Sequence, residues 1–300
     1  MTLLVAGYCL AANGADGVEP SCPGGSAPDP RVIWCDDFDE DRLSRYFEYD
    51  DDDGDFRRVA GVGRHGSTAM RARWEAGDVG AGSLHLAFGR TPSTYFRPVD
   101  AGTANHREIY WRLYLKHQAG WHGGGADKLS RAIVFASGNW AEAAIGHVWS
   151  GTASQGTADY LVIDPASGTD TSGTLLTTVY NDFPNLRWLG AETSTSPVFE
   201  GGHVAEWHCI EAHMELNDLG QSNGIFELWI DGQLEASRSG LNWLGSYSAY
   251  GINAVFLENH WSASPAVLER YFDNFVVSTK PIGCVDAAMP VVPRAPPRAR

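Results

Sequence analysis

The sequence is short of basic residues, and it lacks both a long apolar run and a C-x-x-C pair. Its 22 Lys and Arg stand against 37 Asp and Glu, giving a formal net charge of −15 at pH 7. We expect no nucleic-acid partner, because a phosphate backbone needs a stripe of Lys and Arg and none precedes the C-terminal tail. An anionic polymer is still compatible with a local basic patch. No stretch approaches the roughly 20 apolar residues of a transmembrane helix, so we expect no membrane partner.

The five cysteines are odd in number and scattered, which does not suggest a zinc site. Cys35 opens the first expected strand and Cys284 follows the last. Because first and last strands are often neighbours in a sandwich, we predict a disulfide between these two. Cys209 lies inside an apolar strand, and we expect a small buried hydrophobe there rather than a nucleophile.

The two ends of the chain differ in composition from the middle. Residues 1–30, rich in Gly, Ala, Pro and Asp, read as a leader and linker, and residues 285–300 read as a Pro/Arg-rich tail. Residues 31–284 are long enough for one large β domain, which we expect to be monomeric. The opening apolar segment lacks a positive n-region and reads as a weak or trimmed export signal. This weak signal, the possible disulfide and the resemblance given below together lead us to expect a secreted protein, extracellular or periplasmic.

Alternating apolar and polar residues dominate the middle of the chain and indicate antiparallel β-structure. Turn signals separate the runs: Asn-Asp at 217, Asn-Gly at 223 and Asp-Gly at 231. Nine strands are expected, over residues 108–117, 129–136, 143–149, 160–163, 175–181, 206–216, 225–230, 252–258 and 271–278. This number suits an all-β sandwich of two antiparallel sheets.

Alternation also assigns side chains to faces, because successive residues of a strand point to opposite sides. In the first of these strands the polar row contains Tyr110, Arg112, Tyr114 and Lys116. In the 206–216 strand the corresponding row contains Trp207, Cys209, Glu211, His213 and Glu215, and His147 shares a side with Trp149. Aromatic rings mixed with charges are typical of a ligand surface. We expect one concave sheet to gather these rows.

Three segments carry a resemblance to a known superfamily: EWHCIEAHMELND, NGIFELWIDGQLEASRSGLNW and ERYFDNFVVSTKPIG. With VIWCDDFDED, GSLHLAFGR and YWRLYLK, they resemble the laminin-G-like jelly rolls of the concanavalin A-type lectin and glucanase superfamily over residues 32–284. More narrowly, the chain resembles bacterial polysaccharide lyases of that fold. The resemblance implies β-elimination from a uronic-acid-containing polysaccharide, in which a cation or amide neutralises the carboxylate and Tyr or His moves protons.

The resemblance also implies roles for particular residues. The catalytic candidates are Arg112, Tyr114, His147 and His213. The substrate-binding candidates are Lys116, Lys128, Asn181, Glu211 and Tyr110. A Tyr-x-Lys pattern of alginate lyases is present as Tyr114-Leu-Lys116, but their Gln-x-His pattern is not. By alternation Lys128 and Arg131 should point to opposite faces, so at most one of them should reach the site.

Two other functions remain open from the residues alone. A non-catalytic, lectin-like module would use the same rows to bind a glycan without cleaving it. A glycoside hydrolase needs two carboxylates about 5 to 9.5 Å apart. Glu211 and Glu215 are ~13 Å apart along one strand, so a hydrolase pair would have to come from different strands, such as Glu211 with Glu258.

Metal ligands are not evident. The acidic run Asp50–Asp55 lacks EF-hand spacing and has no Glu at the required distance, so we expect a solvated loop. The chemistry expected from the resemblance needs no cofactor. A structural calcium ion is compatible with the superfamily, although no ligand set can be named from the sequence.

Overall fold

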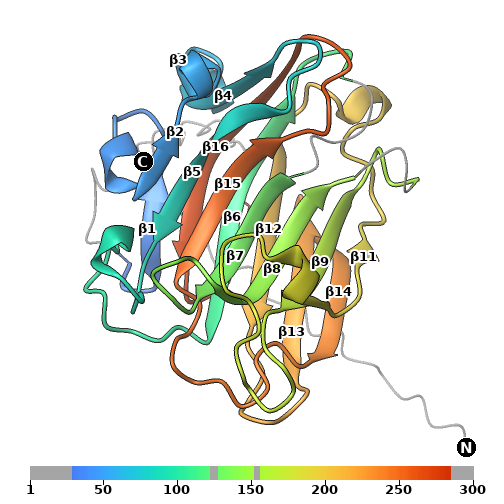
Figure 1. The fold of residues 1–300 in the computed structure, drawn as a ribbon. Coiled ribbons are helices and arrows are strands. Elements are labelled where there is room, and N and C mark those ends of the chain that lie inside the picture. The colour runs from blue at the N-terminus through green and yellow to red at the C-terminus, as the bar shows by residue number, and fades with distance from the viewer. Residues whose placement is uncertain (1–28, 122–127, 152–155, 285–300) are drawn as a thin grey trace, which may run out of the picture.

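Two antiparallel sheets packed face to face form the protein (Figure 1). The computed structural model describes residues 29–121, 128–151 and 156–284. The predicted all-β sandwich of the jelly-roll kind is confirmed. The helices among the described residues are short 3-10 turns, and none is long and apolar enough to cross a membrane.

Each sheet contains eight strands, all paired antiparallel. Sheet A has the order β14-β13-β12-β6-β16-β4-β3, with β1 also paired to β16, and sheet B has the order β10-β9-β8-β7-β15-β5-β2, with β11 paired to β9. The strands of sheet A are β1 (Val32–Asp36), β3 (Arg57–Ala60), β4 (Thr68–Trp74), β6 (Glu108–His117), β12 (His208–Glu215), β13 (Gly224–Ile230), β14 (Gln233–Leu241) and β16 (Leu268–Ser278). Those of sheet B are β2 (Glu48–Asp50), β5 (Gly80–Ala87), β7 (Lys128–Phe135), β8 (Glu142–Ser150), β9 (Leu161–Ser167), β10 (Arg187–Trp188), β11 (Glu192–Thr193) and β15 (Ala254–His260). The 3-10 turns are η1 (Leu43–Arg45), η2 (Asp52–Gly54), η3 (Arg64–Gly66), η4 (Thr94–Phe96), η6 (Phe183–Asn185) and η7 (Gly201–His203).

Most of the predicted strands are present, and one is not. The strand predicted at 108–117 is β6 with the same bounds. Asp231 and Gly232 both have positive φ, 51° and 80°, as the predicted Asp-Gly hairpin turn between β13 and β14 requires. The strand predicted at 175–181 is wrong. Leu175 makes a single bridge to Thr169, and the rest of that segment forms a loop over sheet B.

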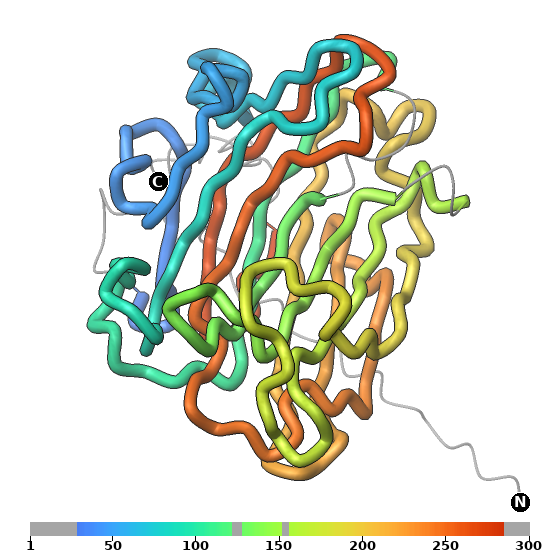
Figure 2. The backbone as a smooth tube through the Cα atoms, viewed as in Figure 1, coloured from blue at the N-terminus to red at the C-terminus, as the bar shows by residue number. Residues whose placement is uncertain are grey.

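The described part of the protein has two clusters of buried apolar side chains. The larger one fills the space between the sheets, and the smaller one lies on the outer face of sheet B. The smaller cluster contains Phe47, Ala87, Phe96, Ile133, Phe135, Ile145, Ala166, Leu186, Ala254 and Phe256. Figure 2 shows the segment around residues 170–190, in yellow-green, crossing in front of sheet B. One part of this outer face is therefore covered by apolar packing, and a polar part with charged side chains lies beside it.

The disulfide connects residues other than those predicted. Cys284 is bonded to Cys209, and Cys35 forms a disulfide of its own, so the predicted Cys35–Cys284 bridge is wrong. The assumption behind the prediction was sound, because β1 does pair with β16. However, the chain turns back after β16 and crosses sheet A to reach β12. Cys209 is consequently a half-cystine rather than a free buried thiol.

Candidate functional site

A row of six paired residues crosses the outer face of sheet B. Residues paired directly opposite each other in antiparallel strands point to the same side of the sheet. In strand order, from β2 to β9, the row is Glu48, His85, Phe256, Arg131, His147 and Asp164. Sequence positions far apart are thus brought into one line of two imidazoles, one guanidinium and two carboxylates.

Arg131 and Glu258 form the centre of this face. Arg131 is 1% exposed, and its Nε and Nη2 lie 2.7 and 2.8 Å from the two carboxylate oxygens of Glu258. Burial alone would raise the pKa of Glu258, but the positive charges of Arg131 and Lys128 outweigh it and lower that pKa to about 2. Glu258 therefore stays ionised across the physiological range.

Lys128 lies on the same face as Arg131, contrary to the prediction. Its Nζ is 3.5 Å from Glu258 Oε1. The pairing of β7 with β8 shifts between Lys128 and Ser130, and such an irregularity breaks strict alternation. Both cations therefore flank one carboxylate, and burial lowers the pKa of the Lys128 ammonium.

The loop that replaces the predicted 175–181 strand covers this ion pair. Arg131 donates hydrogen bonds to Asn181 Oδ1 at 2.9 Å and to the Tyr180 hydroxyl, which in turn donates to Glu258 Oε1 at 3.1 Å. Burial and the charge of Glu258 raise the pKa of Tyr180, so its phenol stays protonated. Asn181 has a left-handed φ of 54°, a conformation that Asn tolerates better than most residues. Its side-chain amide nitrogen makes no hydrogen bond to any residue that the structure describes, so its N–H groups can be offered to a ligand.

Glu142 anchors that loop from below. Its Oε2 accepts the backbone N–H of Asn181 at 3.0 Å, and its own N–H and C=O both bond to the side chain of Thr177. The carboxyl group is fully buried, and burial raises its pKa to about 7 despite Arg131 Nη1 at 3.7 Å. Glu142 therefore stabilises the loop and is too deeply buried to contact a sugar.

His147 is a buried, neutral imidazole. Its Nδ1 lies 3.2 Å from the Asp164 carbonyl oxygen. A carbonyl only accepts, so Nδ1 carries the proton and Nε2 the lone pair. Nε2 is buried and has no hydrogen-bond partner among the described residues. Burial and the charge of Arg131 hold the pKa of His147 well below its usual range, and the ring stacks on Trp149 at 4.4 Å.

His85 is a functional candidate that sequence reasoning missed. Its Nδ1 is 3.0 Å from Glu48 Oε2, and its ring stacks on Phe256 with centroids 3.7 Å apart. Burial opposes ionisation of Glu48, but hydrogen bonds from His85 and Tyr95 outweigh it and lower its pKa. Glu48 is thus an acceptor that keeps the proton on Nδ1 and leaves Nε2 as the basic atom. The signal was present as the His of GSLHLAFGR, a polar residue inside an apolar strand.

The sequence-predicted site residues fall on two opposite faces of the sandwich. His147, Lys128 and Asn181 lie on the sheet B side, with Lys128 and Asn181 in the Arg131 cluster. Six others lie on β6 and β12 of sheet A: Arg112, Tyr114, His213, Lys116, Glu211 and Tyr110. The expectation that one concave sheet would gather all of them is wrong, because alternation assigns a residue to a face of its strand but not to a sheet. It also follows that Glu211 and Glu258 cannot act as a pair across one bond.

On sheet A several of these side chains hold the returning C-terminal segment. Glu211 accepts the backbone N–H groups of Ile282 and Gly283 at 2.8 and 2.7 Å. Arg112 donates to the Gly283 carbonyl at 3.1 Å, close to the disulfide. These contacts give Glu211 and Arg112 a structural role in this protein.

His213 and Tyr114 are also engaged by neighbouring side chains. His213 lies between Glu227, 2.9 Å from Nδ1, and Glu108, 3.2 Å from Nε2. The ring of Tyr110 stacks on His213 at 4.1 Å. The guanidinium of Arg64 lies 3.5 Å above the Tyr114 ring.

Comparison with solved structures relates this architecture to lyases. The chain is similar to a marine PL-14 alginate lyase from Aplysia kurodai, with 13% identity, a TM-score of 0.55, and coverage of 83% of this chain and 99% of that one. An endo-β-1,4-glucuronan lyase from the fungus Trichoderma reesei gives 12% identity, a TM-score of 0.52, and coverage of 83% and 96%. An alginate lyase from a Chlorella virus gives 14%, 0.51, and coverage of 78% and 100%.

The chain has the jelly-roll fold of these lyases. At such identities the likeness establishes the fold and leaves the reaction to be argued from the site. No protein-family model matches the chain, and no curated protein matches it in sequence.

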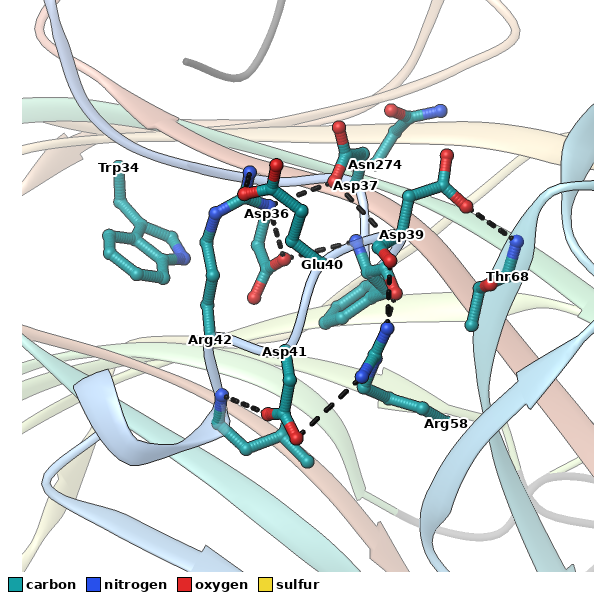
Figure 3. A network of polar contacts seen from close by, with 12 residues as sticks. Trp34, Asp36, Asp37, Asp39, Glu40, Asp41, Arg42, Arg58, Thr68 and Asn274 are labelled. Atoms are coloured by element: carbon teal, nitrogen blue, oxygen red, sulfur yellow. Dashed lines mark hydrogen bonds and ion pairs between the residues drawn. The ribbon is translucent and has the colours of Figure 1, made fainter. Parts of the chain in front are cut away.

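Acidic side chains also gather away from sheet B. At the end of β1 and just after it, Arg42 pairs with Asp36, Asp37 and Glu40 at 3.3, 2.8 and 2.8 Å, which offsets part of the negative charge there (Figure 3). Within the described ranges, one group has ligand atoms close enough for a single metal ion, namely Glu108, His213 and Glu215. Both ring nitrogens of His213 already contact carboxylates there, so the group is satisfied by protein contacts.

Proposed function

We propose that the chain is a polysaccharide lyase that cleaves a uronic-acid-containing polysaccharide by β-elimination on the outer face of sheet B. The observation that carries this proposal is the convergence of Lys128, Arg131 and Tyr180 on the Glu258 carboxylate. Asn181 is bonded to Arg131, and His85 lies on the same face against Phe256. β-Elimination from a uronic acid needs groups of these kinds. A cation or amide must stabilise the carboxylate, a base must take the proton on C5, and an acid must protonate the leaving oxygen on C4.

Lys128 and Asn181 are the groups we assign to the substrate carboxylate. Lys128 is partly exposed, and the Asn181 amide nitrogen is available because its oxygen is held by Arg131. Arg131 is fully buried with its donors directed at Glu258, Tyr180 and Asn181, so it acts as a positioning residue. An anionic sugar held here would have the negative charge developing on its carboxylate matched by fixed donors.

His85 and Tyr180 are the groups we assign to proton transfer. Both rings pack against Phe256, with centroids 3.7 and 6.4 Å away, so they face the same part of the sheet. His85 Nε2 takes the proton from C5, the C4–O4 bond breaks, a C4=C5 double bond forms, and the protonated phenol of Tyr180 donates to O4. His147, one of the catalytic candidates named from the sequence, lies beyond Arg131 with a buried Nε2, and it is the competing candidate for the base.

A lectin-like binding module is the second candidate. Trp188 and Phe183 are 42% and 38% exposed and stack on each other at the β10 edge of the same face. Exposed stacked rings suit the faces of sugar rings whether or not cleavage follows. A hydrolase has less support, because Glu142 is fully buried and Glu258 is occupied by two cations.

We also propose that the protein is exported and works as a monomer on its polymer. The Cys209–Cys284 disulfide supports an oxidising compartment, since such bonds are rare in cytosolic proteins. The polysaccharide partner is supported by the fold shared with alginate and glucuronan lyases.

The experiment follows the ultraviolet absorbance of the C4=C5 double bond with alginate, glucuronan, pectate, heparin and hyaluronan as substrates. Growth of absorbance with one polymer is the expected result. It should disappear in His85→Ala and persist in His203→Ala, an exposed histidine outside the face. Retained absorbance in His85→Ala together with its loss in His147→Ala would transfer the base role to His147. No absorbance with any polymer, with binding intact, would favour the lectin-like module.

A further inference from the structure

The outer face of sheet A carries a second line of paired residues, on the four consecutive strands β3, β4, β16 and β6. Arg57 of β3 is opposite Arg71 of β4, which is opposite Tyr271 of β16, which is opposite Lys116 of β6. The Lys116 ammonium lies 4.7 Å from the ring of Trp207, the residue immediately before β12. We call these five residues the cationic row.

The cationic row faces away from the core. The residues that alternate with it are buried between the sheets: Met70, Ala72, Leu115 and Phe272. Arg57 is exposed, while Arg71, Lys116, Tyr271 and Trp207 are partly exposed. A ligand can therefore reach the row from outside.

The charges of the row are unusual for a protein with a net charge of −15. Arg57 and Arg71 are directly opposite, and like charges in that position destabilise a sheet. Arg57 forms no ion pair with any described residue, and the Nε of Arg71 is buried without a hydrogen-bond partner there. Glu269 lies 3.4 Å from Arg71 and 3.7 Å from Arg73, so it offsets only part of this charge. The row thus carries positive charge, above all at Arg57, that the described part of the chain balances only in part.

Tyr271 lies between Arg71 and Lys116, and Trp207 lies beside Lys116 at the end of the row. The Lys116 ammonium is 4.9 Å from the Tyr271 ring as well as close to Trp207, and it donates to the Val62 carbonyl at 3.2 Å. These contacts fix the ammonium against two rings. Guanidinium groups recognise carboxylate or sulfate, and ring faces recognise the apolar faces of sugars. Together they match a chain of acidic sugars better than a simple anion.

The length of the row also suits a polymer. Neighbouring strands lie about 4.8 Å apart, which is close to the length of one sugar unit in an extended chain. The row runs perpendicular to the strands, so its cations are spaced at multiples of that distance.

We propose that the cationic row is a binding surface for an anionic polysaccharide, on the side of the sandwich opposite the proposed active face. It holds the polymer without cleaving it. The proposal requires an acidic glycan but not the elimination chemistry, so its failure and the failure of the proposed function are separable.

The test is affinity gel electrophoresis of the full chain in gels containing alginate, hyaluronan or heparin. Arg57→Glu with Arg71→Glu should weaken retardation about tenfold in the gel that retards the wild type, and the remaining binding should depend less on salt. Arg90→Glu, an exposed arginine outside the row, is the single-charge control and should change retardation little. Near-ultraviolet circular dichroism establishes that the variants are folded. A double variant that is retarded like the wild type would overturn the proposal, as would an equal loss in Arg90→Glu.

A second variant separates sugar recognition from charge alone. Trp207→Ala should weaken retardation by the acidic glycan but leave binding of inorganic polyphosphate unchanged. Equal effects on both probes would overturn the assignment to a polysaccharide. Elimination activity on a short oligosaccharide should be the same in all these variants, because the row is far from His85 and Tyr180 across the core.

Discussion

Arg131 and Glu258 form a two-point ion pair beneath the polar face of sheet B, and both side chains are almost wholly removed from solvent. Glu258→Gln should therefore destabilise the protein by about 3–5 kcal/mol, because a buried guanidinium loses its counter-charge. Urea unfolding followed by tryptophan fluorescence measures the change. Glu269→Gln, at a partly exposed pair, is the matched control and should cost about 1 kcal/mol or less. A loss as small as the control's would contradict the claim that Arg131 needs Glu258 as its counter-charge.

The same carboxylate predicts how stability responds to acid. The pKa of Glu258 is lowered from 4.5 to about 2 in the folded state. A depressed pKa contributes stability above the unfolded value, and that stability is lost as pH falls from about 4.5 towards 2. The free energy of unfolding should fall more steeply over this window in the wild type than in Glu258→Gln. Parallel curves for the two proteins would contradict the assignment.

Glu142 should have the opposite dependence. Its pKa is raised from 4.5 to about 7, so between these values the folded state binds more protons than the unfolded state. Stability contributed by this group is complete at low pH and decreases as pH rises through the window. Glu142→Gln, which keeps the shape and no charge, should flatten the decrease of unfolding free energy between pH 5 and 7. Chemical denaturation at several pH values tests this, and an unchanged slope would refute it.

His85→Ala should reduce kcat by about 10²- to 10⁴-fold, the usual contribution of a positioned general base. Glu48→Gln should reduce it less and shift the pH profile, because Glu48 orients the ring without touching the substrate. KM should change little in both variants. Initial rates of double-bond formation, measured across pH, give kcat and the pH profile. A Glu48→Gln profile identical to that of the wild type would contradict the role of Glu48 in orienting His85.

The disulfide should stabilise the sandwich from the sheet A side. Cys209 and Cys284 are 75 residues apart, and closing a loop of that size contributes about 4 kcal/mol in the chain-entropy treatment. Cys209→Ser with Cys284→Ser should lower the unfolding free energy by about that amount. Elimination activity should be retained at low temperature, because the proposed active face is on the other sheet. Loss of activity in a folded double variant would place a functional group on sheet A.

The fold was largely predictable because its signals are local. The alternation over 108–117 and the Asp-Gly pair at 231 depend on a few neighbouring residues, and both are found in the structure. The edge strand β14 was missed, since its QLEASRSGL sequence has almost no apolar alternation. The 175–181 segment has the composition of a strand, yet Asn181 turns left-handed to reach Arg131 and Glu142.

The candidate site was less predictable because it depends on which strands become neighbours. Alternation correctly placed Tyr110 and Arg112 on the same face of β6. The sequence of β6 does not indicate, however, that β7 belongs to the other sheet. The irregularity at Lys128 is likewise invisible in the sequence, and it turns that side chain onto the face of Arg131. His85 becomes a candidate base only because Glu48 and Phe256 lie beside it, and strand pairing across the sheet brings them there.

The row across sheet B has a consequence for how the protein is made. Its central strand, β15, comes from near the end of the chain and inserts between β5 and β7, which are synthesised much earlier. Until β15 emerges from the ribosome, His85 lacks its stacking partner Phe256, and Arg131 lacks its two-point partner Glu258. Such non-local pairing is slow to form. The proposed lyase activity should therefore first be measurable only in chains that extend past β15, and no shorter fragment should possess it.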